Sequence, residues 1–99
     1  MKEIFISAIH SKSKLKIGFY SQKDEIEVER TCAPLDYGPS RRTKDQSDRF
    51  HFWDYDGSNG PHTNSQLPEK VLGIELLGEK FEPKSIVKWE PNWIVSRNW

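Results

Sequence analysis

The sequence predicts a mostly-β domain of the α+β class, built as a small antiparallel barrel with an N-terminal helix packed across it. An apolar pattern with helical spacing opens the chain, and short segments with strand-like alternation follow it, separated by turn signals. The chain has 99 residues, which is enough for one modest core. We therefore expect a single domain, with a helix over residues 1–11, a barrel over residues 14–83 and a tryptophan-rich tail over residues 84–99.

The composition narrows the function classes. Four Trp, three Tyr and five Phe argue against disorder. The 15 basic and 15 acidic residues cancel, whereas a non-specific nucleic-acid binder is usually strongly basic, so a polyanion would have to meet a local patch. Cys32 is the only cysteine, which excludes an internal disulfide. No secretory signal or apolar run of roughly 20 residues occurs, so we expect a soluble cytoplasmic protein with no membrane partner.

The first three elements follow from apolar periodicity. A short amphipathic helix is predicted over residues 2–11, with apolar side chains at Ile4, Phe5, Ala8 and Ile9. Leu15, Ile17 and Phe19 alternate with polar residues and predict a strand with one apolar face. Residues 21–24 form a turn, and Ile26 and Val28 alternate with glutamates in a second strand, which completes a hairpin.

The remaining elements are marked by proline, glycine and polar runs. Pro34 is expected to end the second strand, because it donates no ladder hydrogen bond. Residues 36–39 are expected to be a loop or a short bridging strand, and residues 40–48, which lack apolar side chains, an exposed loop. A turn is predicted over residues 57–61 and a central strand over residues 71–77, the most apolar run. The tail is expected to be irregular or weakly stranded over residues 86–89 and 93–96.

An aromatic segment over residues 49–56 is the densest block of chemistry in the chain. Its aromatic content predicts a strand. Alternation places two sets of side chains on opposite faces: Phe50, Phe52 and Asp54 on one, and Arg49, His51, Trp53 and Tyr55 on the other. The first face suits a core. The second carries a cation, an imidazole and two rings, and so predicts a recognition surface.

Basic residues near this strand are candidates for phosphate contacts. Arg30 shares the parity of the apolar residues in its strand, so either an aspartate pairs with it, it reaches the rim, or it binds an anion. Arg41, Arg42 and Lys44 lie in the loop before the aromatic strand, and charge beside stacking rings suits a nucleotide or single-stranded nucleic acid. The predicted ligand-binding residues are Arg30, Arg41, Arg42, Arg49, His51, Trp53 and Tyr55.

The sequence supports an enzymatic function less well than a binding function. His51 and Asp54 have opposite parity on one strand, which disfavours a metal site with Asp56 or His62. Cys32 lies in apolar company, where a thiol is usually inert. No phosphate loop, nucleophile elbow or dinucleotide fingerprint occurs, so we expect neither catalysis nor a cofactor. Trp89, Trp93 and Trp99 in the tail suit a lid over the core more often than a ligand platform, and they could also contact a protein partner or a second copy.

Three stretches together resemble the WYL domain, a small Sm/SH3-like barrel named for a Trp-Tyr-Leu strand. Before its third strand the family has an arginine and a proline, which match Arg30 and Pro34. Its Trp-Tyr-Leu matches Phe50-His51-Phe52, and its closing apolar strand with Phe-x-Pro matches residues 71–83. The resemblance covers residues 8–83.

WYL domains usually act as sensors in bacterial transcription regulators, phage-defence proteins and CRISPR-associated proteins, and bind nucleic acid or nucleotide-like ligands through basic residues. The resemblance thus implies a non-enzymatic sensing or binding module, with a protein-interaction or homo-oligomerisation module as the alternative. Two departures stand out. The family's late arginine-rich stretch is replaced by residues 64–71, which lack arginine, and the DNA-binding helix-turn-helix of the regulators is absent, so this chain alone is not expected to be a transcription factor.

Overall fold

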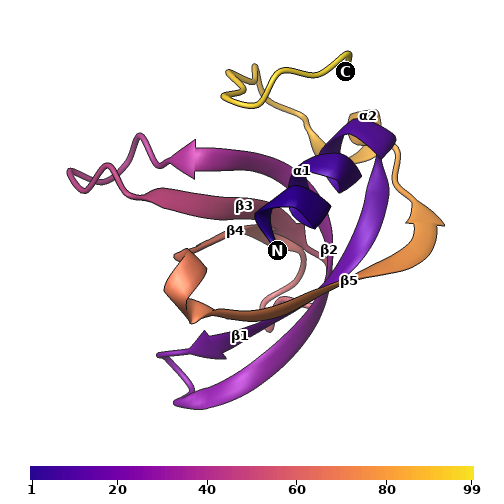
Figure 1. Cartoon of the computed structure of the whole chain (residues 1–99). Helices are drawn as coiled ribbons and strands as arrows, with labels where there is room; N and C mark the ends of the chain where they lie inside the picture. The colour runs from indigo at the N-terminus through magenta and orange to yellow at the C-terminus, as the bar shows by residue number, and fades with distance from the viewer.

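Five antiparallel strands form one curled sheet in the computed structural model, which describes residues 1–99 (Figure 1). The strand order is β4-β3-β2-β1-β5. The fold is mostly β with an N-terminal helix, as predicted. The elements are α1 (Lys2–Ser11), β1 (Ser13–Ser21), β2 (Ile26–Pro39), β3 (Asp48–Asp54), β4 (His62–Gln66), the 3-10 turn η1 (Pro68–Lys70), β5 (Val71–Lys80) and α2 (Pro83–Ile86).

The β1–β2 hairpin forms where the alternating pattern predicts it. Leu15, Ile17 and Phe19 point into the core and are at most 3% exposed. The short η1 turn contacts both β1 and β3, so it bridges the side of the sheet that strand pairing leaves open. The sheet therefore curls into a small barrel.

The helix α1 covers this barrel with the apolar stripe that its spacing predicts. Phe5, Ala8 and Ile9 are fully buried. The ring of Phe5 meets Phe50 of β3 edge to face, with centroids 4.9 Å apart, an arrangement that aromatic pairs favour. The core face of β3 is therefore the one predicted from alternation, with Phe50 and Phe52 buried beneath the helix and β1.

Two predictions about strands are wrong. Strand β2 does not end at Pro34 but continues to Pro39, because the pairing with β3 shifts register between Pro34 and Asp36. A β-bulge of this kind tolerates a residue without an N–H donor. Strand β5 does not lie at the centre, since it pairs only with β1 and forms one edge of the sheet. Its Leu72 and Leu76 are consequently more than half exposed, at 53% and 56%.

The C-terminal tail, residues 87–99, is irregular and is fastened to the barrel by one carboxylate. Asp36, which is 6% exposed, accepts hydrogen bonds from the backbone N–H groups of Ile94 and Val95, each at 2.9 Å. The Nη2 atom of Arg97 donates to the same carboxylate at 3.2 Å. The indole of Trp99 donates to the Ile9 carbonyl at 2.8 Å, which ties the chain end to α1.

Arg97 completes this fastening from the tail side. Its side chain is 1% exposed and lies between Trp93 and Trp99, 4.1 and 4.6 Å from the two ring centroids. It also donates to the Leu35 carbonyl. Burial lowers the pKa of Arg97 to about 10, although the carboxylate of Asp36 opposes the shift, so the guanidinium stays charged at neutral pH. Trp93 and Trp99 thus belong to a lid over the core, the role that the sequence favours.

One backbone position makes room for the tail. Gly38 has a φ of +147°, and a Cβ built on it would lie 2.6 Å from Cδ1 of Ile94. No helix in the structure is long and apolar enough to cross a membrane.

Substituting Asp36 tests whether this carboxylate holds the tail. In Asp36→Asn, Arg97 loses its countercharge while it stays buried, so we expect the free energy of unfolding in urea to fall by about 3 kcal/mol. Asp45→Asn is the matched control, because Asp45 forms an ion pair with Arg49 at 3.3 Å while 53% exposed, and exposed pairs contribute little. Equal unfolding midpoints for the two variants would contradict the proposed fastening.

Candidate ligand-binding site

A cavity of about 780 Å³ lies between the outer face of β3 and β4 and the C-terminal tail. Strand β3 contributes His51 and Trp53, and the loop between β2 and β3 contributes Arg41 and Arg42. The remaining walls include Thr63, Asn64 and Ser65 from β4 and Trp89, Asn92 and Trp93 from the tail. Four of the seven predicted ligand-binding residues therefore meet in one place.

Rings flank the cavity on two sides. Trp53 is half-buried on the sheet side. Trp89 lies on the tail side and is 44% exposed. Trp93 stands beside it, with one face covered by Arg97. The sheet and the tail thus both contribute flat apolar surfaces to one cavity, which suits a planar ligand.

His51 is held in a fixed orientation. Its Nε2 atom lies 2.8 Å from the Gly38 carbonyl, and its Nδ1 atom 2.7 Å from the hydroxyl of Ser65. A carbonyl only accepts, so Nε2 carries a proton, and in the neutral ring Nδ1 accepts from Ser65. Both nitrogens are occupied, and the ring therefore offers the cavity its face rather than a free donor.

Positive charge at the rim comes from the loop. Arg41 and Arg42 are exposed and form no ion pair. Two acids also line the cavity, Asp36 and Glu90, but the oxygens of Asp36 are engaged by the tail. The rim therefore carries two unpaired guanidinium groups against one free carboxylate.

Arg30 lies outside this cavity and takes the ion-pair alternative. Its Nε atom is 3.5 Å from Oδ2 of Asp54, and its Nη1 atom donates to the Asp56 carbonyl at 3.3 Å. The Nε atom is buried and makes no hydrogen bond, so the contact is ionic only. The partner, Asp54, is 1% exposed on the core face of β3, where a buried carboxylate needs a counterion. Arg30 therefore serves as the counterion of Asp54 within the barrel.

Arg49 and Tyr55 also lie elsewhere. The Nη2 atom of Arg49 donates to Asp45 at 3.3 Å, and its guanidinium lines a different cavity with Tyr20. Tyr55 follows the end of β3, so the alternation of the strand no longer governs it. The ammonium group of Lys14 lies 4.9 Å from the centroid of its ring. The structure does not bring these two residues to His51 and Trp53.

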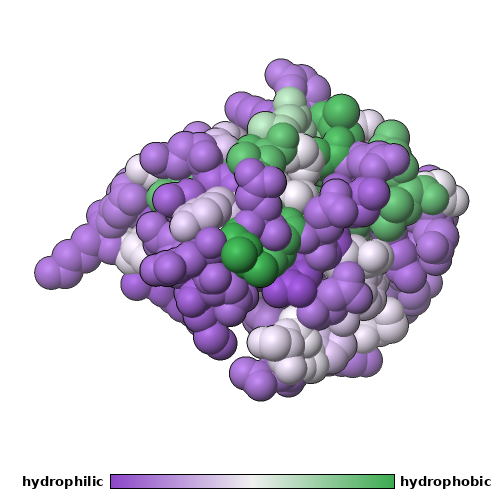
Figure 2. Space-filling model, turned by 90° about the horizontal axis from the view of Figure 1, so that it is seen from below, coloured by the Kyte–Doolittle hydropathy of each residue, from purple (hydrophilic) through white to green (hydrophobic).

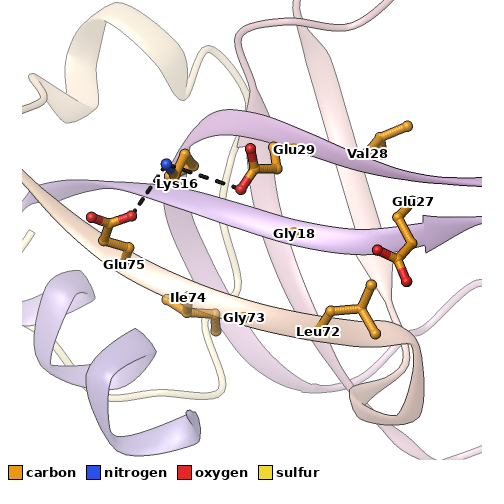
Figure 3. A pocket seen from close by; sticks show the side chains of 9 residues that line it. All are labelled: Lys16, Gly18, Glu27, Val28, Glu29, Leu72, Gly73, Ile74 and Glu75. Atoms are coloured by element: carbon orange, nitrogen blue, oxygen red, sulfur yellow. Dashed lines mark ion pairs between the residues drawn. The ribbon is translucent and has the colours of Figure 1, made fainter.

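The outer face of β2, β1 and β5 carries a second groove, in which acidic side chains predominate (Figure 3). Gly18 and Gly73 face each other across the pairing of β1 with β5 and leave this groove of about 530 Å³ open. Its charged lining is Lys16, Glu27, Glu29 and Glu75. Figure 3 shows the lysine reaching both Glu75, at 3.2 Å, and Glu29, at 4.0 Å. Negative charge prevails there, so this face repels phosphate.

Groups with catalytic potential are few. No cluster of three or more His, Cys, Asp or Glu side chains is arranged to hold a metal ion. The Cys32 thiol is fully buried, and burial raises its pKa far above the ordinary value, with a smaller contribution from the charges of Asp54 and Asp56. A thiol in this state is a poor nucleophile.

Comparison with known proteins yields a likeness of fold. The chain is similar to part of proteasome accessory factor B/C (PafBC) of Arthrobacter aurescens, with a TM-score of 0.64 and 16% sequence identity. The match covers 96% of this chain and 14% of that chain, so this chain spans about one seventh of the length of PafBC. No family model and no curated protein matches the sequence. The likeness shows the fold, and membership of the WYL family stays a prediction.

Sequence reasoning missed the tail as a wall of the cavity. The abundance of tryptophan signalled that residues 84–99 matter, but a ligand platform was the less favoured role, and nothing in the sequence indicated that Trp89 and Trp93 would line one cavity with Trp53. That placement depends on the pairing of Asp36 with Arg97, 61 residues apart in the chain.

The burial of Cys32 gives a direct test of its inertness. We expect the native protein to resist alkylation by iodoacetamide at pH 8 and to react readily in denaturing urea, because only the thiolate reacts and burial suppresses it. Mass spectrometry of the alkylated product measures both states. Rapid stoichiometric labelling of the folded protein would overturn this assignment.

Proposed function

We propose that this chain is a non-enzymatic, WYL-like ligand-sensing or binding module for a nucleotide or a short single-stranded nucleic acid. The observation that supports it best is the cavity between Trp53 and the tail, with the unpaired Arg41 and Arg42 at its rim. Rings would stack on a base, and guanidinium groups would hold a phosphate.

Size and chemistry agree with this proposal. Ligand cavities commonly measure about 300–1,000 Å³, and this one measures about 780 Å³. Stacking of a base on an aromatic side chain contributes about 1–3 kcal/mol by alanine substitution. Arginine matches phosphate oxygens with two parallel hydrogen bonds, so a pair of arginines suits a phosphate better than lysines would.

Two further side chains are available to recognise a base edge. Thr63 of β4 and Asn92 of the tail line the cavity, and their side chains make no hydrogen bond within the protein. Asn64 is less free, because its amide donates to Asp54 at 3.4 Å and its carbonyl accepts from Gln66 at 3.0 Å. A ligand that bridges Thr63 and Asn92 would contact both the sheet and the tail.

The WYL resemblance adds support of a different kind. The motifs around Arg30 and in β3 suggest the family, and the fold likeness to part of PafBC agrees with a small barrel of that sort. In this chain Arg30 is paired with Asp54 and Arg49 lines a different cavity, so the proposal assigns the phosphate contacts of this cavity to Arg41 and Arg42.

A second candidate function is protein interaction or self-association. It is favoured by the unpaired edge of β5, where Leu72 and Leu76 are exposed, and by the exposed Trp89. Figure 2 shows apolar residues gathered in limited patches among hydrophilic ones on the face seen from below. Trp93 and Trp99 are engaged within the molecule, so of the three tail tryptophans Trp89 alone is free to make such a contact.

Nucleotide binding is tested by titrating the tryptophan fluorescence with AMP and with oligothymidylates. We expect Trp53→Ala to weaken binding about fivefold to 100-fold, because one stacking surface is lost. We expect Arg41→Gln with Arg42→Gln to reduce the dependence of affinity on salt, by about 0.7 in the log–log slope for each phosphate contact removed.

The control is Lys12→Gln with Lys84→Gln, which removes the same charge from exposed positions that do not line the cavity. It should bind like the unmodified protein. Thermal melting of each variant checks that folding is retained. Equal affinities in all variants, or no binding by the unmodified protein at any salt concentration, would contradict the nucleotide proposal.

Sedimentation equilibrium separates the two candidate functions. A binding module that acts alone should remain monomeric over a wide range of concentration. Self-association through the edge of β5 would instead raise the mean mass with concentration, and Leu72→Glu with Leu76→Glu would abolish that rise, because charges on a strand edge block its pairing.

A further inference from the structure

A second, smaller cavity lies where three segments meet at one end of the barrel. Its volume is about 330 Å³. The tip of the β1–β2 hairpin, the end of β4 with η1, and the beginning of β3 form its walls. Figure 1 shows the hairpin tip and η1 on the same side of the molecule, at the left of the view. We call it the Tyr20 pocket, after the one aromatic residue in its lining.

The charge of the Tyr20 pocket has a single sign. Lys23, Arg49 and Lys70 line it, and no carboxylate does. The whole chain has 15 acidic and 15 basic residues, so basic side chains are locally concentrated in this pocket. The groove on β1 and β5 has the opposite charge, because glutamates predominate in its lining. Neither lysine forms an ion pair within the protein.

The acids next to this lining in the sequence, Asp24, Asp48 and Glu69, all lie outside it. Asp45 forms the ion pair with Arg49, and two bonds from Ser47 help to lower the pKa of its carboxyl group. Asp24 accepts a hydrogen bond from the hydroxyl of Ser21 at 3.2 Å and lies outside the lining. None of these carboxylates forms an ion pair with Lys23 or Lys70.

Two of the three cations are held in place before any ligand arrives. The ammonium group of Lys70 lies 5.5 Å from the centroid of the Tyr20 ring. The side chain of Arg49 is 14% exposed, and its Nη1 atom lies within hydrogen-bonding distance of the Thr43 hydroxyl, at 3.4 Å, and the Ser47 carbonyl, at 3.3 Å. Preorganised donors lose less conformational entropy when an anion binds.

We propose that the Tyr20 pocket is a second anion site, which takes a phosphate or polyphosphate group through Lys23, Arg49 and Lys70. A neutral donor is at hand in the Gln66 amide, which lies in the same lining and uses only one of its two N–H groups, toward Asn64 at 3.0 Å. This site stands on its own lining and does not require that the larger cavity bind a nucleotide.

The two cavities are neighbours across β4. Ser65 lines both of them, and its hydroxyl is bonded to His51 in the wall of the larger cavity. A ligand with several phosphates could therefore place a base beside Trp53 and a further phosphate in the Tyr20 pocket. This extension rests on the proposed function, whereas the anion site itself does not.

Inorganic tripolyphosphate is the direct probe, because it carries charge and no base. In ¹H–¹⁵N spectra of the full chain we expect its titration to shift the amide signals of the hairpin tip and of residues 65–70. Lys23→Gln with Lys70→Gln should weaken this binding about fivefold to tenfold, as expected for the loss of two partly exposed charge contacts. Lys23→Gln alone should weaken it less, and it lies in an exposed turn where folding is not at risk.

The control pair Lys12→Gln with Lys84→Gln has the same net charge and should bind tripolyphosphate like the unmodified protein. An equal loss in the control pair, or shifts spread over all lysine-rich surfaces, would overturn the site in favour of non-specific attraction. The absence of any localised shift would overturn it as well. Tripolyphosphate binding at the hairpin tip without any binding of AMP would uphold this site while the nucleotide proposal fails.

Discussion

The carboxylate of Asp36 is the constraint on which the shape of this protein depends. It lies just past the bulge in β2, is almost fully buried, and accepts bonds from two backbone amides and one guanidinium of the tail. A buried carboxylate without partners would be costly, and a buried guanidinium equally so, and each group therefore requires the other. Because the pair brings the last residues of the chain back to the sheet, it creates both the lid over the core and one wall of the larger cavity.

The sequence was most informative where contacts are local. The helix from Lys2 to Ser11, the β1–β2 hairpin and the core face of β3 follow from apolar spacing alone, since Phe5, Leu15 and Phe50 each lie at the correct point of a period of 3.6 or 2. Prediction failed where neighbours in space decide. Pro34 ends a strand in most contexts, but the register shift beside it lets β2 continue. The apolar run in β5 suggested a central strand, yet strand order placed it at an edge.

The candidate site divides in the same way. Trp53 and His51 were expected on the outer face of β3, and Arg41 and Arg42 in the loop before it, and these four residues do line one cavity. Arg30 and Arg49 were predicted to join this site because of their charge. The charge of a long side chain does not indicate which carboxylate it will pair with in the folded protein. Asp54 and Asp45 became their partners through tertiary contacts that no spacing reveals. The contribution of Trp89 depends on the Asp36 fastening and was invisible for that reason.

Because the tail forms one wall of the cavity, the ligand affinity that we propose would depend on whether the tail is seated. Only chains with the tail in place possess a complete cavity, so the apparent dissociation constant equals the intrinsic one divided by the fraction of such chains. Thermodynamic reciprocity then requires that any ligand touching both β3 and residues 89–94 also favours the seated tail. Solution conditions that detach the tail would thus raise the apparent dissociation constant without touching the ligand contacts on β3. The final segment would then set the ligand concentration at which the protein responds.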